Sequence, residues 1–134
     1  MTLNPYLSFN GNCAEAFRFY EKALGGKVVF SMTWGQGPPE MQAPGMKDKI
    51  MHTTMKVGDS TLQGADTPQY DKIAGISVAL DIADPDEAER VFAALSEGGV
   101  VHMPIAETFW AKRFGMALDK FGIPWMINCS KPMS

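Results

Sequence analysis

The sequence predicts an α+β protein in which two βαβββ modules form curved mixed sheets around a cavity, with the helices outside. The first supporting observation is an internal repeat of a Glu-Ala pair, a Phe-containing helical stretch, a Gly-Gly pair and a β-branched strand. The Glu-Ala pairs start at Glu15 and Glu87 and the glycine pairs at Gly25 and Gly98, so the spacing of the two copies agrees to within one residue. The second observation is that each half reads as one strand, one helix and three strands.

The repeat also indicates the domain organisation. We interpret the chain as one domain of two repeats, with the first module at residues 1–66, a linker at 67–74 and the second module at 75–134. Neither half has enough apolar surface to stand alone, so the halves are expected to pair. Alternate side chains from several strands would then line the cavity, which is where a pocket is expected.

The elements of the first module each have a local signal. Residues 3–9 are expected to form a strand, followed by a helix that starts after Asn10 or Asn12 and ends at Gly25. Apolar residues recur along this helix at the spacing of one buried face, at Cys13, Ala16, Phe17, Tyr20, Ala23 and Leu24. Further strands are predicted at 27–34, 49–57 and 60–65, with a loop rich in proline and glycine at 35–48.

The second module repeats this order. A strand over residues 75–83 leads to Asp84, Pro85 and Glu87, which are three agreeing signals for the start of a helix. The buried face of this helix is predicted at Ala88, Val91, Phe92 and Leu95. Gly98 and Gly99 are expected to close the helix. The last strands are predicted at 100–105, 114–119 and 123–129.

The bulk composition excludes several function classes. The formal net charge is −3 and no block of lysine or arginine stands out, so we expect neither nucleic acid nor an anionic membrane as a partner. No apolar run is long enough to cross a bilayer, and the N-terminus lacks the pattern of a signal peptide. Cys13 and Cys129 are interpreted as reduced and structural, and the protein as cytoplasmic.

Several segments together resemble a known family. They are Pro5-Tyr-Leu-Ser-Phe-Asn-Gly-Asn12, Glu15-Ala-Phe-Arg-Phe-Tyr20, Lys49-Ile-Met-His52, Asp86-Glu-Ala-Glu-Arg90 and Asp119-Lys-Phe-Gly-Ile-Pro-Trp-Met-Ile-Asn128. With these segments the chain resembles the PhnB-like branch of the vicinal oxygen chelate superfamily, which includes glyoxalase I, extradiol dioxygenases and the bleomycin and fosfomycin resistance proteins. The resemblance covers essentially the whole chain. It implies the paired-module fold and, because members are commonly dimers, a homodimer.

The resemblance also implies where a metal would be held. Metal-using members take His, Glu or Gln ligands from the first and last strands of the paired modules. The matching positions of this chain are Pro5 or Leu7, Gln63, Ser77, and Met126 or Asn128. No histidine or carboxylate stands at these positions, and a catalytic divalent metal needs about three strong ligands. The expectation is therefore no metal site and no cofactor.

Aromatic residues and histidines are the remaining candidates for a pocket. At least one of Trp34, Trp110 and Trp125 is expected to face the cavity, because pockets are lined mainly by apolar and aromatic groups. His52 is either a half-buried, hydrogen-bonded strand residue or a general base or hydrogen-bond partner for a ligand. No carboxylate partner for His52 can be identified from the sequence. His102, on the matching strand of the second half, is interpreted as a half-buried, hydrogen-bonded strand residue.

These observations favour a metal-free protein that binds a small molecule of unknown identity. The alternative is a metal-dependent isomerase, lyase or dioxygenase with non-standard ligands such as His52. A ubiquinone-pathway methyltransferase, a label given to some PhnB-like proteins, is disfavoured because no glycine-rich turn of the usual kind follows the first strand. A phosphonate ligand is disfavoured because no cluster of arginine or lysine would hold its charge.

Overall fold

The computed structural model describes residues 1–132 and divides the chain into two compact units, Met1–Asp71 and the residues from Lys72 onward. The division falls inside the segment 67–74 that the sequence indicates as a linker. Each unit contains one α-helix and one four-stranded sheet.

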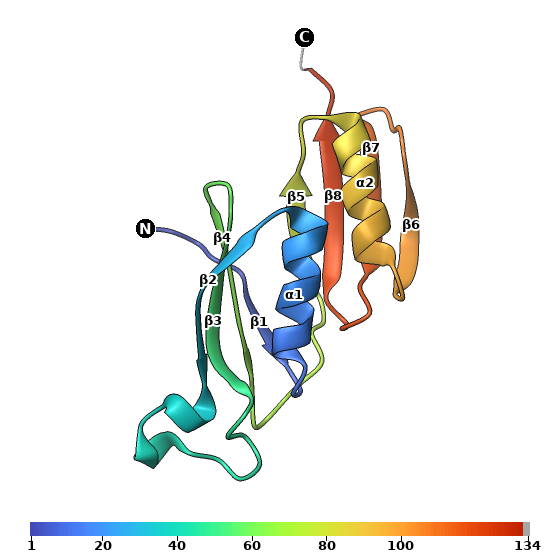
Figure 1. The fold of residues 1–134 in the computed structure, drawn as a ribbon. Helices are drawn as coiled ribbons and strands as arrows, with labels where there is room; N and C mark the ends of the chain where they lie inside the picture. Colours follow the sequence, from blue (N-terminus) through green and yellow to red (C-terminus); the bar gives the residue numbers. More distant parts are fainter. Residues whose placement is uncertain (133–134) are drawn as a thin grey trace. The chain divides into compact units, whose positions relative to one another are not determined.

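The first unit is a βαβββ module (Figure 1). Its elements are β1 (Tyr6–Phe9), α1 (Cys13–Leu24), β2 (Lys27–Thr33), β3 (Ile50–Val57) and β4 (Ser60–Asp66), with 3₁₀ turns at Trp34–Gln36 and Pro39–Met41. The strand order in the sheet is β1-β4-β3-β2. β1 runs parallel to β4 and the other pairs are antiparallel, so the sheet is mixed, as predicted.

The second unit repeats this topology. Its elements are β5 (Val78–Asp81), α2 (Pro85–Ser96), β6 (Val100–Ala106), β7 (Ala111–Leu118) and β8 (Pro124–Ser130). The strand order is β5-β8-β7-β6, again with a parallel pair, β5 and β8, at one side of the sheet. The repeat in the sequence is therefore confirmed as a repeat of structure.

The bounds of three strands differ from those predicted, because a strand extends only as far as a neighbouring strand pairs with it. β1 starts at Tyr6 rather than at residue 3, because β4 pairs with only the four residues Tyr6–Phe9. β5 covers Val78–Asp81 rather than residues 75–83, so Ser77 precedes the strand. β7 begins at Ala111, earlier than predicted, because it pairs with the full length of β8.

Each helix packs a phenylalanine ring onto a glycine of its own sheet. A Cβ added to Gly64 of β4 would lie 2.6 Å from Phe17 Cε1, and one added to Gly115 of β7 would lie 2.7 Å from Phe92 Cε1. Such close approach requires a residue without a side chain. The predicted helix faces are confirmed except at Leu24, which is only partly buried at the end of α1. The buried residues are Cys13, Ala16, Phe17, Tyr20 and Ala23 in α1 and Ala88, Val91, Phe92 and Leu95 in α2.

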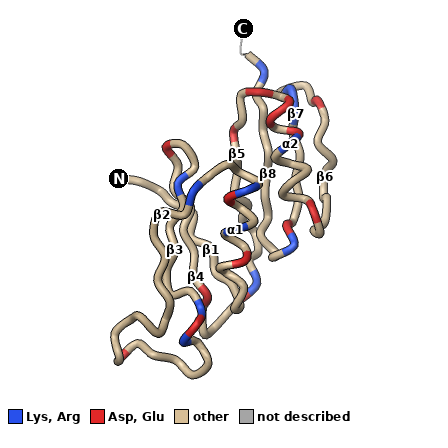
Figure 2. The backbone as a smooth tube through the Cα atoms, in the orientation of Figure 1, with Lys and Arg blue, Asp and Glu red and all other residues tan. Residues whose placement is uncertain are grey.

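Charged residues of both signs are interspersed along the helices and turns (Figure 2). The chain has 12 lysine and arginine residues against 15 aspartate and glutamate residues, so neither sign dominates. Within residues 1–132, no helix has the length and apolar character needed to span a membrane.

Candidate ligand-binding site

Each sheet has one face that packs against the helix of its own unit and an opposite face, which we call the helix-free face. In the first unit Leu7 pairs with Gly64, and both face α1, with Leu7 only 3% exposed. Side chains alternate along a strand, so the neighbouring positions point the other way. Tyr6 pairs with Gln63 and Gln63 pairs with Thr54, which places these three residues together on the helix-free face.

His52 is hydrogen-bonded at both ring nitrogens on this face. Its Nδ1 lies 3.1 Å from Tyr6 Oη, and its Nε2 lies 3.0 Å from Thr54 Oγ1. Two aromatic rings are also near, with centroid distances of 5.6 Å to Tyr6 and 6.0 Å to Phe30. Phe30 pairs with Thr54, so one row of side chains crosses all four strands beside His52. We call Tyr6, Phe30, His52, Thr54 and Gln63 the His52 cluster.

The hydroxyl partners determine how the imidazole is held. Burial, and secondarily Cys13, raises the pKa of Tyr6 above its usual value, so the phenol stays protonated at neutral pH. A phenol is a better donor than an aliphatic hydroxyl. We therefore assign Tyr6 as donor to Nδ1 and the Nε2–H group as donor to Thr54 Oγ1. Among the described residues no carboxylate hydrogen-bonds this imidazole, so His52 is not part of a carboxylate–histidine pair.

The helix-free face of the second unit carries an apolar row of side chains. Met126 pairs with Ala79 on one side and Met116 on the other, and Met116 pairs with Met103. Gly115 faces α2, so its neighbour Met116 points to the opposite side. We call these four residues, from Ala79 to Met103 across the sheet, the methionine row. Flexible thioethers adapt to ligands of irregular shape.

Asn128 lies next to the methionine row and has an unused acceptor. Its Nδ2 donates to Asp81 Oδ1 at 3.2 Å and to Ser130 Oγ at 2.9 Å. Its Oδ1 is buried and accepts no hydrogen bond from any residue that the structure describes. An open pocket of about 480 Å³ adjoins this side chain, with Lys112 and Lys131 also in its lining.

The predicted tryptophans lie in different environments. Trp34 Nε1 donates to the backbone carbonyl of Asp66 at 3.0 Å. Trp110 is 45% exposed, and its ring centroid lies 5.3 Å from that of Phe114. Phe114 pairs with Asn128, so Trp110 borders the helix-free face of the second unit.

Trp125 belongs to the core of the second unit. Its side chain is 1% exposed, and its Nε1 donates to Asp119 Oδ2 at 2.8 Å. It pairs with Ala117, on the same side of β7 as Gly115, and therefore faces α2. The expectation that Trp125 lines a pocket is corrected, because strand alternation turns the indole toward the helix.

Two other predicted positions are also corrected by the strand faces. Leu7 is buried under α1, so the residues of β1 that reach the helix-free face are Tyr6 and Ser8. Ser77 precedes β5, and the residues of that strand on the helix-free face are Ala79 and Asp81, which pair with Met126 and Asn128. Gln63, Met126 and Asn128 do lie on helix-free faces.

Sequence reasoning missed Asp66, the residue that fixes the strands beneath the His52 cluster. Its side chain is 1% exposed. Its Oδ1 accepts the backbone N–H groups of Gly11 at 2.8 Å and Cys13 at 3.0 Å, and its Oδ2 accepts that of Ile50 at 2.9 Å. The carboxylate thus joins the end of β4 to the start of α1 and the start of β3. The one available signal was an aspartate that ends an otherwise uncharged strand pattern.

The donor set of either unit, taken separately, does not fit a catalytic divalent metal. The helix-free face of the first unit offers His52 as its only strong ligand, and that of the second unit offers Asp81 among the described residues. No group of three His, Cys, Asp or Glu side chains placed to hold a metal occurs in residues 1–132. The described residues of each unit, taken separately, therefore support no metal-dependent chemical step.

The two cysteines are packed inside their units. Both thiols are buried, and Cys13 belongs to the buried face of α1. Burial, and then the nearby Asp66 carboxylate, raises the pKa of Cys13 far above its usual value. Such a thiol stays protonated and is a poor nucleophile, so the structural interpretation of Cys13 is confirmed.

Comparison with known proteins identifies the class. Residues 2–127 match the Glyoxalase/Bleomycin resistance protein/Dioxygenase superfamily, and the chain belongs to that superfamily. The chain is 35% identical to Protein YjdN of Escherichia coli (strain K12), with 98% of this chain and 97% of that protein covered.

Solved structures show the same relationship. The crystal structure of protein PA1353 from Pseudomonas aeruginosa is similar with a TM-score of 0.90 and 44% identity, covering 98% of this chain and 99% of that one. A Bacillus cereus PhnB protein, described as a putative 3-demethylubiquinone-9 3-methyltransferase, is similar with a TM-score of 0.81 and 22% identity, covering 97% and 100%. At that identity the likeness shows the fold alone.

Proposed function

We propose that this protein binds a small organic molecule on the helix-free face of its first unit, through the His52 cluster and without a resident metal. The observation that carries the proposal is the imidazole of His52, held at both nitrogens by the neutral hydroxyl groups of Tyr6 and Thr54. Such an arrangement holds the ring in one orientation beside two hydroxyl groups that can bond to a ligand.

The composition of the cluster indicates the chemistry of the ligand. Tyr6 and Phe30 present aromatic rings on either side of the polar groups, with Tyr6 49% exposed and Phe30 51% exposed. Gln63 adds an amide that can both donate and accept a hydrogen bond. A planar, uncharged compound with one or two polar substituents matches this mixture of aromatic and hydrogen-bonding groups.

The metal-free part of the proposal rests on the chemistry of the donors. Elemental analysis of the purified protein should find no stoichiometric Zn, Mn, Ni or Fe, and adding these ions should leave ligand affinity unchanged. A stoichiometric metal that His52→Ala releases would instead favour the alternative, a metal-dependent isomerase, lyase or dioxygenase.

The ligand proposal is tested with a library of planar aromatic and heteroaromatic compounds, screened by thermal shift and by tryptophan fluorescence. Compounds that bind should lose at least tenfold in affinity with His52→Ala, since the variant removes the ring and leaves the Tyr6 and Thr54 hydroxyls without their partner. The matched control is His102→Ala, which removes the other histidine of the chain, an exposed residue of β6. His102→Ala should change the affinity for these compounds by less than twofold. The proposed site would be refuted if both variants lost the same affinity, or if compounds bound His52→Ala as tightly as the wild type.

We also propose a homodimer, supported by the apolar residues on the edge strands β2 and β6. Val29, Val100 and Val101 are 56%, 52% and 46% exposed in the single chain. Exposed apolar edge strands are usually covered by a partner or protected by charge. Sedimentation velocity at micromolar concentration should show a dimer, and a clean monomer would contradict this expectation.

A further inference from the structure

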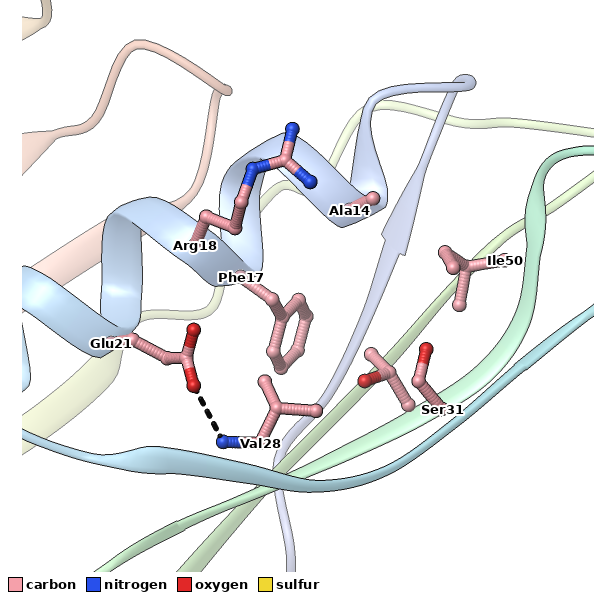
Figure 3. Close-up of a pocket in the computed structure, with 8 residues that line it drawn as sticks. Ala14, Phe17, Arg18, Glu21, Val28, Ser31 and Ile50 are labelled. Atoms are coloured by element: carbon pink, nitrogen blue, oxygen red, sulfur yellow. Dashed lines mark hydrogen bonds between the residues drawn. The ribbon is translucent and has the colours of Figure 1, made fainter.

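A second pocket lies on the opposite side of the first sheet, between α1 and strands β2 and β3 (Figure 3). Its volume is about 190 Å³. Its apolar lining comes from Phe17 of α1, Val28 of β2 and Ile50 of β3. At about 30 Å³ per water molecule the space equals roughly six waters, and it is smaller than the range of about 300–1,000 Å³ typical of sites for drug-sized ligands. The pocket therefore admits only a small compound.

The pocket carries one positive and one negative side chain that are not paired with each other. Arg18 and Glu21 both line it from α1, three residues apart. Glu21 Oε2 accepts the backbone N–H of Val28 at 2.8 Å, the bond drawn in Figure 3. Within residues 1–132, Glu21 Oε1 and the guanidinium of Arg18 make no further hydrogen bond or ion pair. An acceptor and a donor group of opposite charge are thus available beside an apolar surface.

We propose that this pocket binds a free amino acid with a short aliphatic side chain. Arg18 would receive the α-carboxylate, for which a planar guanidinium is the best-matched cation. Glu21 would receive the α-ammonium at Oε1, and the aliphatic group would lie against Phe17. The hydroxyl of Ser31, also in the lining, supplies a neutral hydrogen-bonding group. The proposed site is on the opposite side of the sheet from the His52 cluster and shares no residue with it. A negative result at one site therefore does not contradict the other.

The test uses L-leucine and two analogues that each lack one charge, namely leucinamide without the carboxylate and 4-methylpentanoate without the ammonium. Two-dimensional amide NMR of the intact protein should show L-leucine shifting the signals of Val28 and Ser31 with millimolar affinity. Each analogue should bind at least fivefold more weakly. Equal binding of leucine and either analogue would overturn the proposal, as would the absence of shifts at these amides.

Charge-removing variants connect the ligand groups to the side chains. Arg18→Gln should reduce leucine binding to the level of leucinamide, and Glu21→Gln should reduce it to the level of 4-methylpentanoate. Glutamine at position 21 keeps an oxygen acceptor for the Val28 N–H, so the fold is preserved. The controls on the same helix are Lys22→Gln and Glu15→Gln, which change charge by the same amounts outside the pocket lining. Their effects should stay below twofold, and losses as large as those of the pocket variants would refute specific recognition.

Discussion

Replacing Asp66 with asparagine tests how the first unit is held together beneath the His52 cluster. The native carboxylate accepts three backbone N–H groups, two at Oδ1 from Gly11 and Cys13 and one at Oδ2 from Ile50. Asparagine has the same shape but only one acceptor oxygen. If that oxygen accepts the hydrogen bonds from Gly11 and Cys13, the amide NH₂ faces the N–H of Ile50. Both of these groups are donors, so no hydrogen bond forms between them.

The expected loss of stability follows from these three bonds. A hydrogen bond to a charged acceptor contributes about 1.5–3 kcal/mol, so losing the bond from Ile50 costs about 2 kcal/mol. The bonds from Gly11 and Cys13 become bonds to a neutral oxygen, which is roughly half as strong, and this change costs about 1 kcal/mol each. The free energy of unfolding should therefore fall by about 4 kcal/mol, a large part of the ~5–15 kcal/mol typical of a folded domain.

Urea unfolding, followed by circular dichroism and by the fluorescence of Trp34 and the other tryptophans, measures this loss. The control is Asp59→Asn in the exposed turn between β3 and β4, which should change stability by less than about 0.5 kcal/mol. A loss of less than about 1 kcal/mol for Asp66→Asn at unchanged m-value, or losses that are equal at both positions, would show that the buried carboxylate does not hold these segments together.

Three further predictions follow from the packed interior. Gly64→Ala should lower the free energy of unfolding by about 1–3 kcal/mol in urea melts, because the new methyl group meets the Phe17 ring at 2.6 Å. Trp125→Phe should cost about 2 kcal/mol or more by the same measurement, because it removes the indole N–H that donates to Oδ2 of the buried Asp119 carboxylate; an unchanged midpoint would contradict its core position. The Cys13 thiol has a raised pKa in the folded state. Its contribution to the free energy of unfolding is therefore fully present below the pKa of the unfolded state and is lost as pH rises above about 9. Relative to Cys13→Ala, the wild type should lose about 1.4 kcal/mol per pH unit there, and parallel stability–pH curves would be the contrary result.

The fold was predictable because its signals are local and occur twice. The α2 start at Asp84 and the apolar faces of both helices follow from short-range spacing, and the structure has them where the sequence indicates. Because each half has the same succession of one strand, one helix and three strands, the sequence predicts two copies of one unit, and the two sheets do share one topology; the strand order itself comes from the structure.

The site was predictable only in part because it depends on strand register. A shift of one residue moves a side chain to the other face of a sheet. This is why the sequence indicates Pro5 or Leu7 at the first-strand position although Tyr6, which lies between them, is on the helix-free face. It is also why Trp125 is among the three tryptophans considered for a pocket although it packs under α2. The role of Asp66 comes from three contacts that lie distant in sequence, and no local pattern encodes them.

Both copies of the module keep an apolar packed face, and they differ in chemistry on their helix-free faces. On the packed side, each unit sets a helix phenylalanine on a strand glycine, although Gly64 lies in β4, the counterpart of β8, and Gly115 lies in β7, the counterpart of β3. On the opposite side, the first unit has the row Tyr6, Gln63, Thr54 and Phe30, whereas the second unit has the row Ala79, Met126, Met116 and Met103 across the corresponding strands. The packed face is constrained because a volume change there costs stability, whereas the helix-free face can change without disturbing the helix. The helix-free face of each unit is therefore free to acquire its own chemistry, polar and aromatic in the first unit and apolar in the second, while the packed face keeps the fold.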